Sequence, residues 1–257
     1  MSSSDPAKVF AALLKRLRGK HEGVPPVIPD DPASHGSALI EQLIYSFMLW
    51  EASSSQAKVG ARKLAESFAD LNELRVAFPH ETAGVLGERY PLAVERCLRL
   101  RCVLQELYQR EHAMSLVSLI SAGKREARQY LESMPGMPTF VAARMLAIGL
   151  GGHAVPADYR LMELLSDEKA LPEDVDGPGE ASAWLERQVR ASEAGVVASV
   201  LQGWSDEKGT SPKFDRSFAA SALTVPVGVS VTGPAKSKRQ SPRPKLGRRG
   251  ATKGRSK

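Results

Sequence analysis

Asp158 lies 22 residues after Gly136, and both residues are of types that could take part in binding or catalysis. Asp158 lies in the string Val-Pro-Ala-Asp-Tyr-Arg, where Pro156 favours the start of a helix headed by the aspartate. A carboxylate near a helix N-terminus favours its ionised form, because the helix dipole attracts negative charge. Such a carboxylate can stabilise the positive charge that develops on a sugar when a glycosidic bond breaks. The simpler alternative is that Asp158 only caps its helix.

A tight turn upstream of Asp158 is the second chemical feature. The pattern predicts helices over 124–133 and 139–147, with Pro135-Gly136 as the turn between them. Gly136 can adopt the positive φ that such a turn needs. The start of the second helix would point backbone N–H groups outward, which forms an anion site suited to one phosphate of a nucleic-acid strand. The residues expected to contact DNA are Pro135, Gly136, Met137, Thr139 and Phe140. A plain helix connector is the alternative, and Pro138, without an N–H, weakens the site.

This segment resembles the helix-hairpin-helix and catalytic aspartate of the endonuclease III-like (HhH-GPD) superfamily of DNA glycosylases. The superfamily's hairpin reads Leu-Pro-Gly-Val-Gly, and its aspartate follows at the spacing of Asp158. The Pro-x-Asp-Tyr string is similar to that of the alkyladenine glycosylases. The resemblance extends over roughly residues 36–204. It implies an all-α, two-lobed, DNA-glycosylase-like fold in which Asp158 is the catalytic carboxylate.

Two departures from the superfamily's pattern narrow the implied activity. The lysine with which some members form a Schiff base falls at Phe140, which has no nucleophile. The resemblance therefore implies a monofunctional glycosylase, without a lyase step through position 140. No cysteine follows the segment 200–204, so the iron–sulfur cluster of several members would lack its ligands. Since no metal-ligand spacing stands out either, we expect no metal and no cofactor.

Glu51, three aromatic residues and one histidine are candidates for contact with a flipped base or with DNA. The resemblance places Glu51 where many members carry a glutamine that fills the gap left by the flipped base. Trp50 and Tyr159 are candidates for the base pocket or for intercalation, and Phe140 for stacking on an electron-poor base. Each aromatic residue could equally belong to the core. His153 is a candidate for phosphate contact or proton transfer, with a loop residue of no such role as the alternative.

Composition divides the chain into three parts. Residues 1–33 contain an amphipathic helix that begins at Asp5-Pro6 and a linker; we expect the helix to pack on the domain, with a targeting or membrane-surface helix as the alternative. Residues 34–205 show the apolar periodicity of a helical body. Residues 206–257 end in a segment, 236–257, with ten basic and no acidic residues. We expect this basic tail to be disordered and to contact nucleic-acid phosphates, or merely to aid solubility.

Individual helices follow from apolar spacing. The pattern predicts helices over 71–78 after Asp70, over 92–111 after Pro91, and over 180–202 after a loop at 166–179. The residues of the 92–111 helix expected to face the core are Val94, Leu98, Val103, Leu104 and Leu107. On the earlier helix pair, Val59 is expected to continue the buried face with Leu64.

Charge and hydropathy restrict the class of protein. The net charge of +6 resides in the tail, since the rest of the chain holds 25 basic against 29 acidic residues. No apolar run reaches the roughly 18–20 residues of a membrane span, and the N-terminus lacks a secretory signal. We expect a cytoplasmic monomer, associated with the nucleoid if bacterial, that binds double-stranded DNA and no membrane. The predicted function is monofunctional base excision by a DNA glycosylase. A non-catalytic DNA-binding protein on a degenerate scaffold and a helical interaction protein unrelated to nucleic acid are the alternatives.

Overall fold

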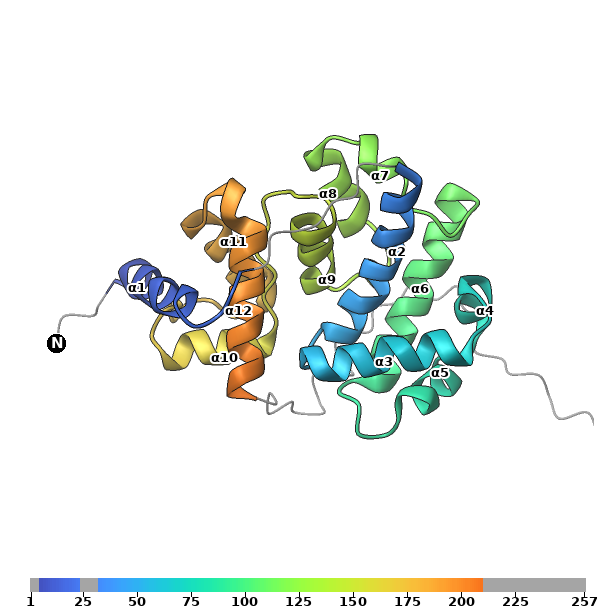
Figure 1. Ribbon diagram of the computed structural model, residues 1–257, viewed down its shortest axis with the longest axis horizontal. Coiled ribbons are helices and arrows are strands. Elements are labelled where there is room, and N and C mark those ends of the chain that lie inside the picture. Colours follow the sequence, from blue (N-terminus) through green and yellow to red (C-terminus); the bar gives the residue numbers. More distant parts are fainter. Residues whose placement is uncertain (1–4, 24–31, 210–257) are drawn as a thin grey trace, which may run out of the picture. The chain divides into compact units, whose positions relative to one another are not determined.

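The computed structural model describes residues 5–23 and 32–209, and every regular element in these ranges is a helix (Figure 1). The predicted all-α class is therefore confirmed for the described residues, whereas the predicted tail at 236–257 lies outside them. In chain order the helices are α1 (Pro6–Arg18), α2 (Pro32–Leu49), α3 (Ser54–Ser67), α4 (Leu71–Val76), α5 (Pro79–Leu86), α6 (Ala93–Glu111), α7 (Ser118–Ser121), α8 (Lys124–Glu132), α9 (Thr139–Arg144), a π-helical turn (Met145–Gly149), α10 (Tyr159–Asp167), α11 (Pro178–Gln188), a 3₁₀ turn (Ala191–Glu193) and α12 (Ala194–Lys208).

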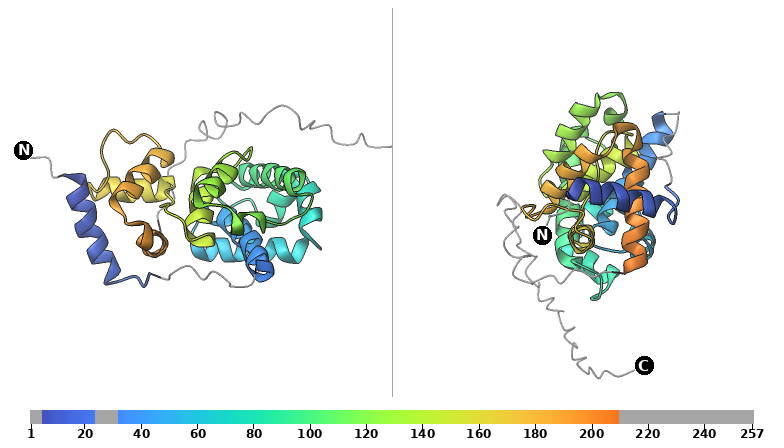
Figure 2. Two further views of the ribbon diagram at one scale, coloured as in Figure 1. Left: turned by 90° about the horizontal axis from the view of Figure 1, so that it is seen from above. Right: turned by 90° about the vertical axis from the view of Figure 1, so that its left-hand side faces the viewer.

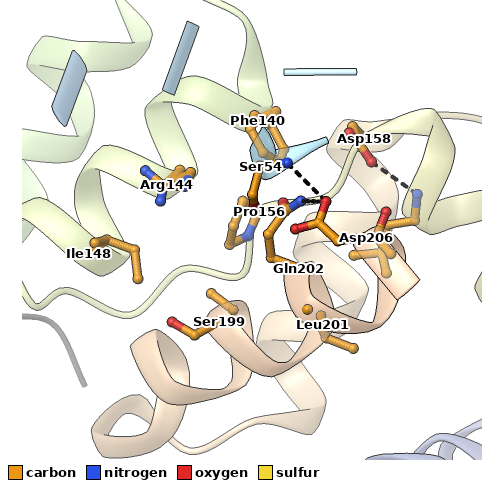
Figure 3. Close-up of a pocket in the computed structure, with 14 residues that line it drawn as sticks. Ser54, Phe140, Arg144, Ile148, Pro156, Asp158, Ser199, Leu201, Gln202 and Asp206 are labelled. Atoms are coloured by element: carbon orange, nitrogen blue, oxygen red, sulfur yellow. Dashed lines mark hydrogen bonds between the residues drawn. The ribbon is translucent and has the colours of Figure 1, made fainter. Parts of the chain in front are cut away.

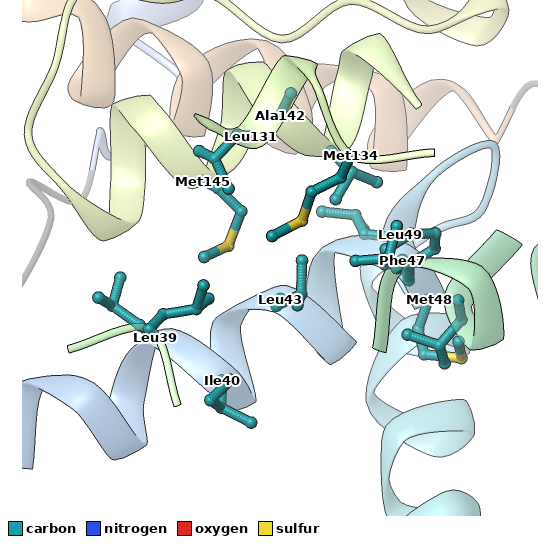
Figure 4. Packing of buried hydrophobic residues seen from close by; sticks show 14 of the residues in the cluster. Leu39, Ile40, Leu43, Phe47, Met48, Leu49, Leu131, Met134, Ala142 and Met145 are labelled. Atoms are coloured by element: carbon teal, nitrogen blue, oxygen red, sulfur yellow. The ribbon is translucent and has the colours of Figure 1, made fainter. Parts of the chain in front are cut away.

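Two hydrophobic clusters form the core. The first cluster is built from α2 to α9 and the π-helical turn, and Figure 4 shows α2 residues such as Leu43 facing Met134 and Met145 across it. The second cluster is built from α1 and α10 to α12. Along the chain the first cluster ends at Ala154 and the second resumes at Val155. The segment that joins the two clusters thus leads directly into Asp158.

Helix α1 packs on the second cluster. Its predicted start is confirmed, because the Asp5 side chain accepts a hydrogen bond from the Ala7 N–H at 3.1 Å. Phe10 is buried, and its ring meets the ring of Trp184 edge-on with centroids 5.7 Å apart. Two views show α1 beside the α10–α12 group (Figure 2). The apolar stripe of this helix therefore faces the protein.

The single helix predicted over 180–202 is wrong, because the chain breaks there into α11, a 3₁₀ turn and α12. Val189, at the break, has extended backbone angles, and its carbonyl oxygen lies 2.9 Å from Nε2 of His153. A tertiary hydrogen bond thus replaces helical bonding at a position where the apolar pattern continues. Helix α5 was not predicted; it begins at Pro79, directly after the extended residue Phe78.

The expected core face of α6 is only partly right. Val103, Leu104 and Leu107 are buried, whereas Val94 is 59% exposed and Arg96 is fully buried. Val94 lies in the first turn of α6, a helix that begins directly after Leu92, whose backbone is left-handed (φ 51°). Val94 lies outside the apolar cluster. Val59 of α3 is also exposed, contrary to expectation.

Candidate active site

The predicted turn before α9 is present and is a type II turn. The Met137 N–H donates to the Met134 carbonyl oxygen at 3.1 Å, and Gly136 has a φ of +83°. A Cβ added to Gly136 would lie 3.2 Å from Cβ of Cys102 on α6, so the turn is packed closely against that helix. The backbone N–H of Met137, one of the residues expected to contact DNA, is already used by the turn itself.

The start of α9 keeps other donors. Its first intrahelical bond runs from the Ala142 N–H to the Pro138 carbonyl, so helical bonding leaves the N–H groups of Thr139 and Phe140 without an intrahelical acceptor. Thr139 is exposed, whereas Phe140 is 4% exposed. The residues that could contact a phosphate are therefore Thr139 and the first turn of α9, beside the half-buried Pro135 and Gly136.

The segment between α9 and Asp158 is held by side-chain hydrogen bonds to its carbonyl groups. Ser182 Oγ donates to the Val155 carbonyl at 2.6 Å, and Arg128 donates to that of His153 at 2.6 Å. His35 and Lys124 bond the carbonyls of Gly149 and Leu150 in the same way. The His153 ring is bound to the Val189 carbonyl, so this geometry assigns His153 to structure rather than to proton transfer. The π-helical turn and the fixed segment set the position of Asp158.

Asp158 is the N-cap of α10. Its Oδ1 accepts from the Leu161 N–H at 2.9 Å, and its side chain is buried, with the residue 4% exposed. Burial raises the pKa of Asp158, while the N–H of Leu161 and the charge of Arg160 oppose that rise. Burial therefore opposes the preference for the ionised form that the helix start and its hydrogen bonds confer on this carboxyl.

Glu51 joins Asp158 at the same helix start. Glu51 has a φ of +56°, its N–H donates to Oδ2 of Asp158 at 3.2 Å, and its Oε1 accepts from the Tyr159 N–H at 2.9 Å. Burial first, and then the nearby Asp158 charge, raise the pKa of Glu51 well above its usual value. The residue is 1% exposed. The expectation that Glu51 fills the gap left by a flipped base does not fit this placement, because the side chain lies inside the protein and caps α10.

Trp50 and Tyr159 lie near this pair but outside the cavity that Asp158 lines. Trp50 packs on the first cluster, and the guanidinium groups of Arg96 and Arg99 lie 5.7 and 5.6 Å from its ring centroid. Tyr159 is partly buried, and burial raises the pKa of its hydroxyl. The geometry therefore gives neither ring a place in the cavity.

A cavity of about 210 Å³ lies in front of Asp158 (Figure 3). Phe140, Arg144 and Ile148 form one wall, whereas the opposite wall comes from α12. The remaining lining is Ser54, Pro156, Asp158, Leu161, Ala198, Ser199, Leu201, Gln202, Gly203, Ser205 and Asp206. The two positions that the superfamily resemblance marks as central, Phe140 and Asp158, thus share one cavity.

Several polar residues of the cavity were missed by sequence reasoning. Asp206 Oδ1 accepts from the Ser54 N–H at 3.0 Å and from Gln202 at 3.1 Å, which links α12 to the start of α3. Arg144 follows Phe140 by one helical turn and therefore shares its face, a spacing that the sequence already contains. Its burial lowers the pKa of the guanidinium to about 10. The α12 residues carried no comparable signal.

Two arginines fix the connection between α2 and α3, which carries Glu51. Arg96, fully buried on α6, donates to the carbonyls of Phe47, Trp50 and Pro91. Arg160, on α10, donates to the carbonyls of Ala52 and Ser205. Backbone carbonyls at the end of a helix need such donors when they are buried. Both arginines therefore help to position Glu51 beside Asp158.

Within residues 5–23 and 32–209, no three His, Cys, Asp or Glu side chains group in a way that could hold a metal ion. In the same ranges no helix is long and apolar enough to cross a membrane.

The fold is similar to that of solved DNA glycosylases, although no protein-family model and no curated protein sequence matches the chain. A trapped endonuclease III–DNA covalent intermediate aligns at a TM-score of 0.56 and 11% identity, over 77% of this chain and 85% of that one. MBOgg1 in complex with a low-affinity DNA ligand aligns at a TM-score of 0.54 and 16% identity, over 80% of this chain and 72% of that one. A thermostable thymine-DNA glycosylase aligns at a TM-score of 0.51 and 14% identity, over 78% of this chain and 86% of that one. The chain therefore has the endonuclease III-like DNA glycosylase fold.

Proposed function

We propose that this protein is a monofunctional DNA glycosylase that removes a damaged or mismatched base from double-stranded DNA. The observation that supports this most directly is that Asp158 and Phe140 line one cavity, on a fold shared with DNA glycosylases. A base extruded from the duplex would enter the cavity and lie against the Phe140 ring. The chain would act as a monomer.

The proposed reaction is hydrolysis of the N-glycosidic bond. As the bond between C1′ and the base nitrogen breaks, its electron pair leaves with the base, and the sugar becomes positively charged. The Asp158 carboxylate stabilises that charge, water adds to C1′, and the proton that this water loses balances the one taken up by the departing base. Hydrogen bonds from Leu161 and Glu51 hold the carboxylate in place. Since Phe140 offers no amine, the product is an intact abasic site.

The proposed grip on the DNA strand is the start of α9. Thr139 is exposed there and supplies a hydroxyl beside the first-turn N–H groups. Because the turn already uses the Met137 N–H and Pro138 has none, this contact offers fewer donors than the superfamily pattern implies. We therefore expect phosphate contact at this point to be weak.

The test is incubation of the full chain with duplexes that each carry one lesion: uracil, hypoxanthine, 8-oxoguanine, thymine glycol, 3-methyladenine or 7-methylguanine. We expect one or a few duplexes to acquire an abasic site that is cut only after alkali treatment. Borohydride should trap no covalent complex. Strand cleavage without alkali, or a trapped complex, would contradict the proposed monofunctional hydrolysis.

A second candidate is a non-catalytic DNA-binding protein on the same scaffold. Both carboxylate oxygens of Asp158 already accept hydrogen bonds, which is the arrangement of a structural cap. This alternative predicts affinity for duplexes that contain a tetrahydrofuran abasic analogue, together with inactivity on every lesion above. The same panel of duplexes therefore distinguishes the two functions.

A further inference from the structure

Arg144 is the cationic residue of the cavity lining, and side chains of α2 hold its guanidinium in place. Its Nη1 donates to Ser46 Oγ at 3.0 Å, and its guanidinium carbon lies 5.1 Å from the Tyr45 ring centroid. Ser46 is itself fixed, because its hydroxyl donates to the Gln42 carbonyl at 2.6 Å and accepts from the Gln42 amide at 3.2 Å. The guanidinium is therefore preorganised on α2 side chains while the residue lines the cavity.

The guanidinium lacks a compensating anion. Among the residues that the structure describes, none of the ion pairs involves Arg144, and Ser46 is its hydrogen-bond acceptor. Burial lowers the pKa to about 10, which still leaves the group charged at neutral pH. Asp206, on the opposite wall, directs Oδ1 to Ser54 and Gln202 instead. The guanidinium is partly buried, and the donors that Ser46 does not use can bind a ligand in the cavity that supplies acceptors.

The position of Arg144 relative to the proposed base stack suggests which ligand that is. Arg144 lies one helical turn after Phe140, and both side chains belong to the same cavity wall (Figure 3). A base stacked on Phe140 would present its hydrogen-bonding edge to groups beside the ring. A guanidinium matches carbonyl oxygens of that edge, whereas it repels a base that carries a positive charge.

We propose that Arg144 determines substrate specificity, selecting neutral bases with an exposed carbonyl oxygen, such as deaminated or oxidised bases, against cationic N-alkylated purines. This inference rests on the proposed glycosylase function, and it deepens that function by naming the substrate class. It adds a specificity determinant to the stacking of an electron-poor base that is expected of Phe140.

The experiment measures binding of the full chain to four duplexes made uncleavable by a 2′-fluoro sugar or by a tetrahydrofuran. The duplexes carry uracil, 8-oxoguanine, 7-methylguanine or the abasic analogue. We expect the wild type to bind uracil or 8-oxoguanine more tightly than 7-methylguanine. Arg144→Met should weaken binding to that preferred neutral base about tenfold or more, because a hydrogen bond to a charged group is lost. It should leave affinity for the abasic analogue unchanged, since that duplex has no base to contact.

Three variants serve as comparisons. Arg144→Gln keeps a donor and should retain part of the preference, and Ser46→Ala should weaken the preference by loosening Arg144. Arg62→Met, at an exposed arginine of α3, makes the same charge change and should alter no affinity. Circular dichroism identifies any variant that fails to fold, in which case Ser46→Ala and Arg144→Gln carry the test.

Each contrary outcome is distinct. If Arg144→Met lost affinity equally for all four duplexes, Arg144 would contact a phosphate of the DNA strand, and the specificity role would be overturned. Tighter wild-type binding to 7-methylguanine would overturn the inference while leaving the glycosylase function intact. If the wild type binds the abasic analogue yet neither recognises nor cleaves any lesion, the proposed function itself fails and the inference fails with it.

Discussion

The backbone N–H of Glu51 donates to Oδ2 of Asp158 over 3.2 Å, although the two residues are 107 positions apart in the chain. The two acids also share one helix start. Asp158 accepts from the Leu161 N–H, and Glu51 accepts from the Tyr159 N–H, so both carboxyl groups cap α10. The left-handed backbone of Glu51 makes this double contact geometrically feasible. The carboxylate proposed to act on the sugar is thus positioned by a second acid.

Replacing Glu51 by glutamine should change how stability depends on pH. Because the pKa of Glu51 is raised in the folded protein, the folded state holds its proton more tightly than the unfolded chain does. The wild type therefore loses free energy of unfolding as the pH rises from the usual carboxyl range through the raised pKa. Glu51→Gln keeps the acceptor for Tyr159 but does not titrate, so this loss should disappear.

The measurement is urea denaturation of wild type and Glu51→Gln from pH 4.5 to pH 8. The difference in free energy of unfolding between the variant and the wild type should grow in favour of the variant as the pH rises. Parallel stability curves across this range would contradict the assignment of a raised pKa to Glu51.

Replacing Gly136 by alanine should destabilise the protein by more than about 1 kcal/mol, because the position needs a positive φ and the added Cβ would press on Cys102. Gly84→Ala is the matched control. No atom lies within 4 Å of an added Cβ there, and the residue is inside α5, so alanine should stabilise by about 0.5–1 kcal/mol. Thermal unfolding of both variants checks the pair. Equal shifts in Tm would show that the turn does not require glycine.

Removing the guanidinium of Arg96 should cost about 3 kcal/mol, since Arg96→Met leaves the buried carbonyl of Phe47 and the partly buried carbonyls of Trp50 and Pro91 without their donor. Arg62→Met removes an exposed side chain that faces Glu66 at 3.7 Å and should cost less than about 1 kcal/mol. Chemical denaturation gives both values. A loss below about 1 kcal/mol in Arg96→Met would mean that water replaces the buried arginine.

Phe140→Leu separates packing from base stacking. The ring is 4% exposed and also lines the cavity, so leucine should cost about 1.5 kcal/mol of stability or less. If the ring stacks on the base, affinity for the preferred lesion duplex should fall several-fold, while affinity for the abasic analogue stays the same. Equal affinities of wild type and Phe140→Leu for the lesion duplex would assign Phe140 to the core alone.

The elements that sequence reasoning predicted well are those marked by local chemistry. Pro135-Gly136 can hardly continue a helix, so the turn before α9 follows from the residues themselves. Asp5 and Asp70 precede apolar periodic segments, and both are N-caps in the structure. Phe140, directly after the turn, lines one cavity with Asp158, whereas none of residues 135–139 lines it.

The contacts that sequence reasoning missed are set by tertiary packing. Nothing local in α6 shows that Arg96 donates to carbonyl groups at the C-terminal end of α2, and that contact is what allows a charged residue to be buried. The role expected for Glu51 came from the superfamily resemblance, and nothing in the local sequence reveals its partners, Asp158 and the α10 N–H groups, which are far away in the chain. The α12 side of the cavity, including Gln202 and Asp206, shows no spacing that links it to Phe140.

The most direct test of the catalytic proposal is the single-turnover rate of base release by Asp158→Asn, on the lesion that the wild type cleaves best. Asparagine can still accept from the Leu161 N–H, so folding is checked by thermal unfolding and binding by the abasic-analogue duplex. We predict a fall in the rate of about 100-fold or more, with affinity for the analogue unchanged or higher. A rate within about threefold of the wild type, in a variant that folds and binds normally, would contradict the assignment of Asp158 as the catalytic carboxylate.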